Sequence, residues 1–260
     1  MTSIAPPGAA TKKLVSQLRS RADEVRKQFN VDGLVTGTTA INIDTSDKLS
    51  SALPVYLVVV VGLALLLLLL VFRSLAVPVK AVVGFLLTIA SSMGIVVFVF
   101  QQGHLAGLFG VHNTPPVISF LPILMIAILF GLAMDYQVFL VSRMRESYVH
   151  GGDPQRAVIS GFSASARVVT AAAIIMICVF GSFIFGPEPT IKSVGLALAF
   201  GVLADGFLVR MTLVPAILTL LGHSAWKLPA MLDRALPNVD IEGEQLTRHL
   251  AQTEAHAEPS

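Results

Sequence analysis

Residues 117–146 read VISFLPILMIAILFGLAMDYQVFLVSRMRE, and this stretch decides the fold class. Its first eighteen residues carry no charge, and Asp135 and Tyr136 then interrupt an apolar run that ends near Val141. As a helix, a run of about 20 apolar residues crosses the roughly 30 Å hydrocarbon core of a bilayer. The stretch therefore predicts a membrane-spanning helix that contains an ionisable residue.

The composition of the whole chain also indicates a membrane protein. Hydrophobic residues make up 54% of the 260 residues and charged residues only 13%, whereas soluble domains contain about 25% charged residues. The single cysteine, Cys178, excludes a disulfide framework within the chain. The six histidines are scattered without the spacing of a metal site, and no basic and aromatic surface suggests nucleic acid. We expect no metal, no cofactor and no nucleic-acid partner.

Two short motifs fall short of enzyme signatures. Residues 161–165 read GFSAS, which departs from the nucleophile motif G-x-S-x-G at its last position. Residues 186–193 read GPEPTIKS, with Ile191 where a phosphate-binding loop has its second glycine. We therefore expect that the protein is not an enzyme.

Five stretches are long and apolar enough to cross a bilayer. We place them at about 53–72, 77–100, 117–141, 167–185 and 193–221, within a transmembrane domain over 52–223. Residues 224–260 are predicted to form a tail that is disordered at its end, where acidic residues replace apolar ones. The predicted fold class is an all-α polytopic membrane protein.

The residues before the first span have a different pattern. Residues 11–29 carry an apolar stripe at helical spacing on a basic helix, typical of a helix on a soluble domain or on a membrane surface. Leu34–Thr36 is a candidate strand, and Asp44, Ser46 or Asp47 is a candidate cap for a helix that continues into the membrane. Residues 1–51 are too few to bury a core alone, so we interpret them as the end of a larger domain.

The distribution of lysine and arginine predicts the orientation of the helices. Basic residues lie in the 73–80 turn, the 142–167 loop and the C-terminal tail, whereas the other side has only Lys192. The positive-inside rule then makes the basic loops and the C-terminus cytoplasmic and residues 1–51 extracytoplasmic. No preceding helix is available to bring residues 1–51 across the membrane, so we expect a fragment, or a chain that needs a partner.

Asp135 is the first candidate functional residue. An aspartate at the centre of a membrane helix costs about 3 kcal/mol on insertion scales, whereas a hydrogen bond between membrane helices contributes about 0.6 kcal/mol on average. A static hydrogen bond therefore offsets little of this cost. A carboxylate that takes up and releases a proton, with the Tyr136 hydroxyl as its hydrogen-bond partner, accounts for it better.

The last span carries Asp205 and Arg210. Five positions on an α-helix correspond to about 140° of rotation, so we expect these two residues not to pair with each other. Asp135 is then the expected acceptor for Arg210, and a static ion pair between helices is the structural alternative. Pro215 lacks an amide donor, so we expect a kink or local opening near Arg210. Asp205 is assigned a structural or supporting role.

Small and hydroxyl-bearing residues in the spans are expected to serve packing. Glycine and alanine allow close helix approach, and hydroxyl groups bond back to their own helix. The first group comprises Gly131, Ala133, Gly195, Ala199 and Gly201, and the second comprises Ser91, Ser92, Thr170 and Ser182.

Four long motifs occur in order: GLAMDYQVFLVSRMRE, GGDPQRAVISGFSASARVVTAAAIIM, GLALAFGVLADGFLVRMTLVPAILTLLG and WKLPAMLDRALPNVDIEGE. Over about residues 30–245 the chain resembles the C-terminal half of the MMPL family, within the resistance-nodulation-division (RND) superfamily of bacterial exporters. The resemblance implies that residues 1–51 are a remnant of an α/β extracytoplasmic porter domain. It also implies that the five spans are the last five of twelve.

The resemblance also implies a function. In that family an Asp-Tyr pair from each half relays protons at mid-membrane and drives export of lipids or other hydrophobic molecules. Asp135 and Tyr136 match the second-half pair, and Asp205 and Arg210 match a shared last-helix pattern. Gln137 stands where the family often has glutamate, and the first half with its own pair is missing. Transporters built from repeats place their site between the two halves.

We therefore interpret the chain as the C-terminal segment of a proton-motive-force-driven exporter in a bacterial plasma membrane. Its expected partners are the bilayer, the proton, a hydrophobic or lipid substrate and the missing N-terminal half. The alternatives are a split half or truncated assembly partner that does not transport alone, a membrane-embedded lipid transferase, and a non-functional truncation.

Overall fold

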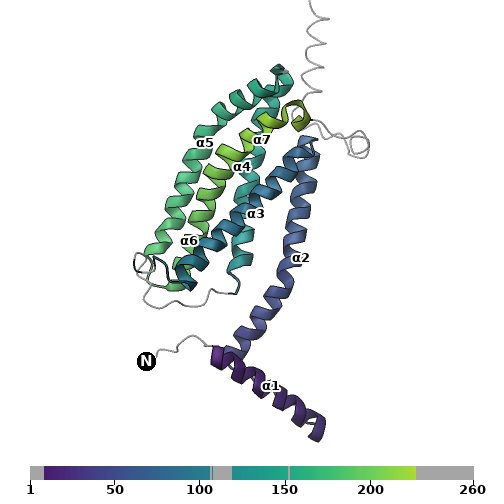
Figure 1. The fold of residues 1–260 in the computed structure, drawn as a ribbon, viewed down its shortest axis with the longest axis vertical. Coiled ribbons are helices and arrows are strands. Elements are labelled where there is room, and N and C mark those ends of the chain that lie inside the picture. Colours follow the sequence, from purple (N-terminus) through teal and green to yellow (C-terminus); the bar gives the residue numbers. More distant parts are fainter. Residues whose placement is uncertain (1–8, 106, 108–118, 152, 227–260) are drawn as a thin grey trace, which may run out of the picture.

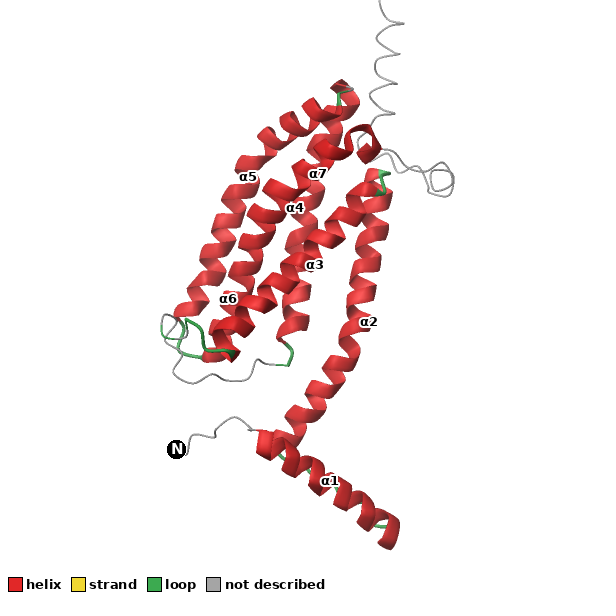
Figure 2. Cartoon of the chain, in the orientation of Figure 1, coloured by secondary structure: helices red, strands yellow, loops and turns green. Residues whose placement is uncertain are grey.

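The computed structural model describes residues 9–105, 107, 119–151 and 153–226, and this part of the chain is helical without any strand (Figures 1 and 2). The α-helices are α1 (Ala9–Phe29), α2 (Thr38–Phe72), α3 (Ala76–Val96), α4 (Leu121–Gly151), α5 (Pro154–Ser182), α6 (Pro189–Leu203) and α7 (Val214–Leu221). Two π-helical segments, η1 (Val97–Gln101) and η3 (Ala204–Leu213), and two 3₁₀ turns, η2 (Phe183–Phe185) and η4 (Gly222–Trp226), continue them.

Five of the described helices are long and apolar enough to span a bilayer, which confirms the predicted number. They are α2, α3 with η1, α4, α5 with η2, and the continuous helix formed by α6, η3, α7 and η4. Several helices extend beyond the predicted spans: α2 begins at Thr38 rather than near 53, and α5 begins at Pro154 rather than near 167. Hydropathy detects the apolar core of a helix, whereas its polar ends follow from hydrogen bonding and caps.

Helices α3, α4, α5 and α6–α7 pack side by side, and α2 leans away from them toward its N-terminal end (Figure 1). Helices α4 and α5 approach closely at Gly161, where a Cβ atom would lie 2.6 Å from Met144 Cα. On α2, the buried side chains Leu68 and Phe72 lie near the C-terminal end, whereas Val58 and Leu63 are exposed. Apolar exposure of this kind suits a surface that faces lipid or another protein surface.

One end of the bundle joins three parts of the chain, and we call it the basic end: residues 73–75, Arg143–Tyr148 and Gly222–Trp226. The buried Ser74 hydroxyl donates to the Ala225 carbonyl at 2.5 Å. The Tyr148 and Trp226 rings stack with centroids 5.3 Å apart. The Arg145 guanidinium donates to the Phe72 carbonyl. These contacts fix the α2–α3 turn, the end of α4 and η4 to one another.

The segment before α2 differs from its prediction. Residues 11–29 lie within a helix as expected, but Leu34–Thr36 is irregular, since no second strand in the described part is available to pair with it. Helix α2 begins after Gly37, whose φ of 128° suits glycine. Asp44 caps no helix; it forms an ion pair with Arg19 at 2.6 Å, and this hydrogen bond raises the pKa of Arg19.

Candidate functional site

The π-helical segment η3 brings Asp205 and Arg210 together. Arg210 Nε donates to Asp205 Oδ2 at 2.5 Å, and the two side chains are 2% and 13% exposed for Arg210 and Asp205 respectively. In a π-helix the backbone bonds run from residue i to i+5, so residues five apart lie on one face. The expectation that the two residues do not pair is therefore wrong, because it assumed α-helical periodicity.

The backbone around η3 shows how this wider turn is maintained. The Val214 amide donates to the Val209 carbonyl, and the Thr212 hydroxyl donates to the Phe207 carbonyl at 3.0 Å; both bonds join residues five apart. Pro215, which has no amide proton to donate, follows directly in the first turn of α7. This confirms the predicted local opening near Arg210.

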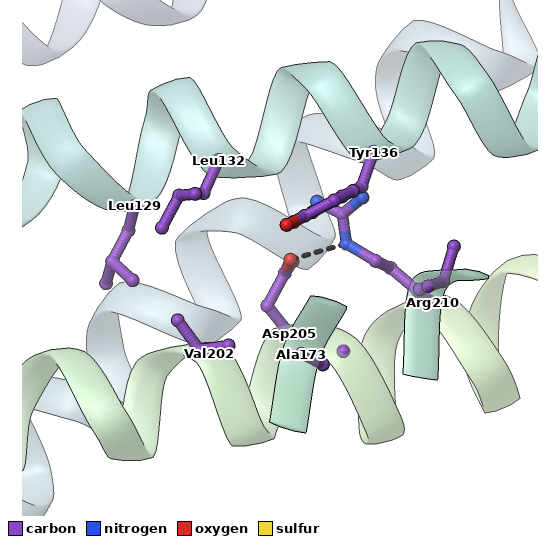
Figure 3. A pocket seen from close by; sticks show the side chains of 9 residues that line it. Leu129, Leu132, Tyr136, Ala173, Val202, Asp205 and Arg210 are labelled. Atoms are coloured by element: carbon purple, nitrogen blue, oxygen red, sulfur yellow. Dashed lines mark hydrogen bonds and ion pairs between the residues drawn. The ribbon is translucent and has the colours of Figure 1, made fainter. Parts of the chain in front are cut away.

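Arg210 also connects η3 to α4. Its Nη2 donates to the Ala133 carbonyl at 2.6 Å, and its Cζ lies 5.3 Å from the centre of the Tyr136 ring, within cation–π range. In Figure 3 the Tyr136 and Asp205 side chains point toward one another from α4 and η3, and the dashed ion pair joins Asp205 to Arg210. The positive charge of Arg210 is thus compensated within the bundle by Asp205 and not by Asp135.

Asp135 and Tyr136 point in different directions. Asp135 is exposed and makes no hydrogen bond or ion pair with any described residue, whereas Tyr136 is half-buried beside Arg210. Consecutive residues of an α-helix differ by about 100° in direction, so Tyr136 can face the bundle while Asp135 lies on the exposed face. The prediction that Asp135 accepts from Arg210 is wrong, because Asp135 lies on the outer face of α4.

A cavity of about 10 Å³ lies beside the ion pair, between Tyr136, Asp205, Gly206 and apolar side chains of α4, α5 and α6 (Figure 3). This volume corresponds to about one water molecule. Within the described part of the chain, Arg210 Nη1 is buried without a hydrogen-bond partner. The cavity is therefore bordered by the Asp205 carboxylate and the Tyr136 phenol. It also lies next to the Arg210 guanidinium, one of whose nitrogens has no hydrogen-bond acceptor in the described part.

Close packing positions α6 and η3. The Ser92 hydroxyl donates to the Ala197 carbonyl at 2.5 Å, so it joins α3 to α6 and does not bond back to its own helix as predicted. A Cβ atom on Gly201 would lie 2.7 Å from Ser92 Oγ, which confirms the packing role of that glycine. Gly131 has no neighbour within 4 Å of its Cβ position, so the packing role assigned to it is wrong.

The remaining hydroxyl groups behave as predicted. Each donates to a carbonyl three or four residues earlier on its own helix; Thr170 Oγ1 also lies 3.8 Å from Met211 Sδ of η3. They are Ser91, Thr170 and Ser182, with acceptors Thr88, Ala166 and Val179.

The model of the MMPL family matches residues 5–239, most of the chain. The chain belongs to the MMPL family. It is a multi-pass membrane protein, as its five apolar helices and its relatives indicate.

Three relatives show what this MMPL chain is similar to. Membrane protein YdfJ of Bacillus subtilis is 55% identical over 245 residues, which are 94% of the chain and 33% of YdfJ. The mycolic acid-containing lipids exporter MmpL11 of Mycolicibacterium smegmatis is 37% identical over 92% of the chain and 25% of its own length. The trehalose monomycolate exporter MmpL3 of Mycobacterium tuberculosis is 37% identical over 90% and 24% respectively. The chain thus spans about a quarter to a third of these relatives.

Two buried polar residues of the MMPL chain escaped the sequence reasoning. The sequence places Lys80 with the charges of the 73–80 turn, but only 7% of it is exposed. Gln137 is 4% exposed, whereas its neighbour Asp135 is exposed. A helical projection of α3 would have placed Lys80 on the same face as Gly84 and Thr88, and this was the available signal.

Proposed function

We propose that this chain is the C-terminal part of a proton-motive-force-driven exporter of lipids or other hydrophobic compounds in a bacterial plasma membrane. Membership of the MMPL family and the names of two relatives, which are lipid exporters, support the export of lipid. The single observation that carries the proton coupling is the buried pair of Asp205 and Arg210, which joins η3 to the Ala133 carbonyl and Tyr136 ring of α4.

The proposed orientation puts the basic end in the cytoplasm. Arg143 and Arg145 lie at that end, and Arg73 is in the turn between α2 and α3. Arginine and lysine in short connections are retained on the cytoplasmic side. Asp205 and Tyr136 then lie within the span, and residues 1–51 lie on the extracytoplasmic side.

Protonation of Asp205 would change what Arg210 contacts. With Asp205 charged, the guanidinium is neutralised within η3. With Asp205 neutral, the positive charge has only the Ala133 carbonyl, the Tyr136 ring and water near it. A buried charge that loses its partner is strongly unfavourable, so proton uptake would favour a different arrangement of η3 against α4. Tyr136 borders the same cavity and is placed to donate to the carboxylate.

Asp135 has a separate role in the proposal. It lies on the outer face of α4, where an uncompensated aspartate is costly in hydrocarbon. The relatives are three to four times longer than the matched segment, so a further part of the protein covering this face would remove Asp135 from lipid. We propose that Asp135 takes up and releases protons at that contact, with Tyr136 as the next group inward.

The second candidate function is that of a split half or assembly partner that does not transport alone. The exposed position of Asp135, together with the limited coverage of the relatives, favours it specifically. Transport by the 260-residue chain reconstituted alone would exclude this alternative, whereas transport only after co-expression with an N-terminal half would support it.

The test uses the full-length exporter in proteoliposomes with a pH-sensitive dye inside. Asp205→Asn and Asp135→Asn should each abolish the proton flux that accompanies substrate export, measured at equal amounts of folded, reconstituted protein. The control is Asp153→Asn, because Asp153 is an exposed carboxylate outside the span that caps α5. Undiminished proton flux in Asp205→Asn would refute the proposed coupling.

A further inference from the structure

Lys80 is the least expected charge in the bundle. It lies in the second turn of α3, is 7% exposed, and its Nζ has no hydrogen-bond partner within the described structure. Four residues further along α3, a Cβ on Gly84 would lie 2.4 Å from Val209 Cγ1, so α3 meets η3 beside Arg210. One α-helical turn is about 5.4 Å. Lys80 therefore lies about one turn from the ion-pair level, toward the basic end.

Gln137 occupies the corresponding place on α4. It is 4% exposed, and its Nε2 is likewise unpartnered among the described residues. It follows Ala133, whose carbonyl accepts from Arg210, by one turn in the direction of the basic end. Helices α3, α4 and η3 thus each contribute one buried and unmet donor to the same half of the bundle: Lys80 Nζ, Gln137 Nε2 and Arg210 Nη1.

No carboxylate of the described part meets Lys80. Asp205 is bonded to Arg210, Glu146 to Arg143, and Asp153 to Arg156 and the Gln155 amide. The other titratable groups on the elements packed against α3 at this end are Arg73, Arg145, Tyr148 and His223; Arg145 donates to Phe72, and Tyr148 packs on Trp226 and His223. Lys80 is thus left without an anionic protein partner in this part of the chain.

Buried donors are almost always hydrogen-bonded, and internal water supplies the bonds that the protein does not. Water suits this set because it accepts from all three donors and can also donate onward. Val77, Ala81, Leu140 and Val214, on the same helices or directly after η3, form part of a buried apolar cluster and offer water no side-chain hydrogen-bond partner. Water in this half of the bundle would therefore lie next to Arg210, Gln137 and Lys80 and not beside the apolar side chains.

We propose that water molecules connect Arg210, Gln137 and Lys80 and continue to the basic end, and that Lys80 passes protons between this water and the cytoplasm. When Asp205 releases a proton, water accepts it and delivers it to the amine of Lys80, and the resulting ammonium releases it to water at the cytoplasmic side. No bond other than those to this proton is made or broken. The direction of proton transfer rests on the proposed function. The presence of water between these three side chains does not depend on it.

The first experiment measures water directly. In a full-length Cys178→Ser background, single cysteines replace Lys80, Gln137, Ala81 or Leu140, and a charged, membrane-impermeant methanethiosulfonate is added to inside-out vesicles. Only a thiolate in contact with water reacts. Lys80→Cys and Gln137→Cys should react at least about tenfold faster than Ala81→Cys and Leu140→Cys. Ala81 is the matched control because it is also 7% exposed and adjacent in sequence, and Leu140 controls for the space that truncation creates.

Equal labelling of all four cysteines, or of none, would overturn the water path whatever the outcome for transport.

The second experiment measures proton flux in proteoliposomes with Lys80→Met and Lys80→His. Lys80→Met should slow the flux about tenfold, and Lys80→His should restore it with a pH profile shifted to lower pH, because imidazole titrates below an amine. Full flux in Lys80→Met, or equal loss without a pH shift in both variants, would overturn the role of Lys80. Labelling as expected with normal flux in Asp205→Asn would instead refute the proposed function.

Discussion

Removing both charges of the Asp205–Arg210 ion pair should destabilise the bundle no more than removing the charge of Asp205 alone. Arg210 is 2% exposed and Asp205 13%. In Asp205→Asn the guanidinium stays buried with an amide in place of its counterion. Loss of one partner from a buried pair costs about 3–5 kcal/mol. Since the Ala133 carbonyl still accepts from Nη2, we expect the lower limit, about 3 kcal/mol.

Arg210→Met leaves a carboxylate that borders the cavity and can become neutral by binding a proton, so its cost should be smaller, about 2 kcal/mol. If the two effects were independent, the double variant would lose about 5 kcal/mol, the sum of these values. Neither buried charge remains in the double variant, and replacing a buried pair by neutral groups is often nearly neutral. We expect it to lose no more than about 3 kcal/mol, which corresponds to an interaction term of at least about 2 kcal/mol.

The assay is reversible unfolding of the purified protein in mixed micelles of a mild detergent and dodecyl sulfate, followed by far-ultraviolet circular dichroism. Asp153→Asn is the control, since that exposed carboxylate pairs with a 90% exposed Arg156, and surface pairs contribute about 0–1 kcal/mol. If the double variant lost the sum of the two single losses in free energy of unfolding, the two side chains would act independently. The ion pair within η3 would then contribute nothing to stability.

Three further predictions follow from close contacts and exposure. Gly161→Ala should destabilise the protein by about 2 kcal/mol or more in the same assay, because its Cβ would lie 2.6 Å from backbone atoms of Met144. The control is Gly62→Ala, which should be neutral or stabilising because nothing lies within 4 Å of its Cβ position. Equal losses of stability in the two variants would contradict the close packing at Gly161. Ser74→Ala should cost about 1 kcal/mol and loosen η4, measured as faster amide exchange there; unchanged exchange would contradict this. Asp135→Asn should leave the stability of the 260-residue chain within about 0.5 kcal/mol, since the residue is exposed and unpaired in the described part; a larger loss would reveal a partner.

The sequence predicts the five spans well because hydropathy over about 20 residues is a local property. It predicts side-chain pairing poorly for a physical reason. The angle between Asp205 and Arg210 depends on whether the helix closes its bonds at i+4 or i+5, and nothing in the residues between them determines that choice alone. A proline at 215 and opposite charges five apart were the two clues to the wider turn.

Burial posed a second difficulty. Lys80 lies next to a basic turn in sequence, so a sequence analysis assigns it to the cytoplasmic surface. In the structure, Val77 and Ala81 on the same helix belong to a buried apolar cluster with residues of α4 and α7, and Lys80 between them is buried as well. Conversely, Asp135 lies within a predicted apolar span and is nevertheless exposed. Which face of a helix is covered depends on its neighbours, and those are fixed only by the fold.

Under the proposed function, α4 is the element that joins the two carboxylates. Within one turn it presents Asp135 outward and both Tyr136 and the Ala133 carbonyl inward to Arg210. A change of charge at either aspartate therefore acts on the same helical turn from opposite sides. Because Arg210 contacts that turn through its Nη2 and the Tyr136 ring, the proposed proton exchange at Asp205 would shift the position of α4, and a surface that covers Asp135 would respond to the shift. The π-helical turns of η3 make this arrangement possible, since an α-helical segment would place Asp205 about 140° away from Arg210.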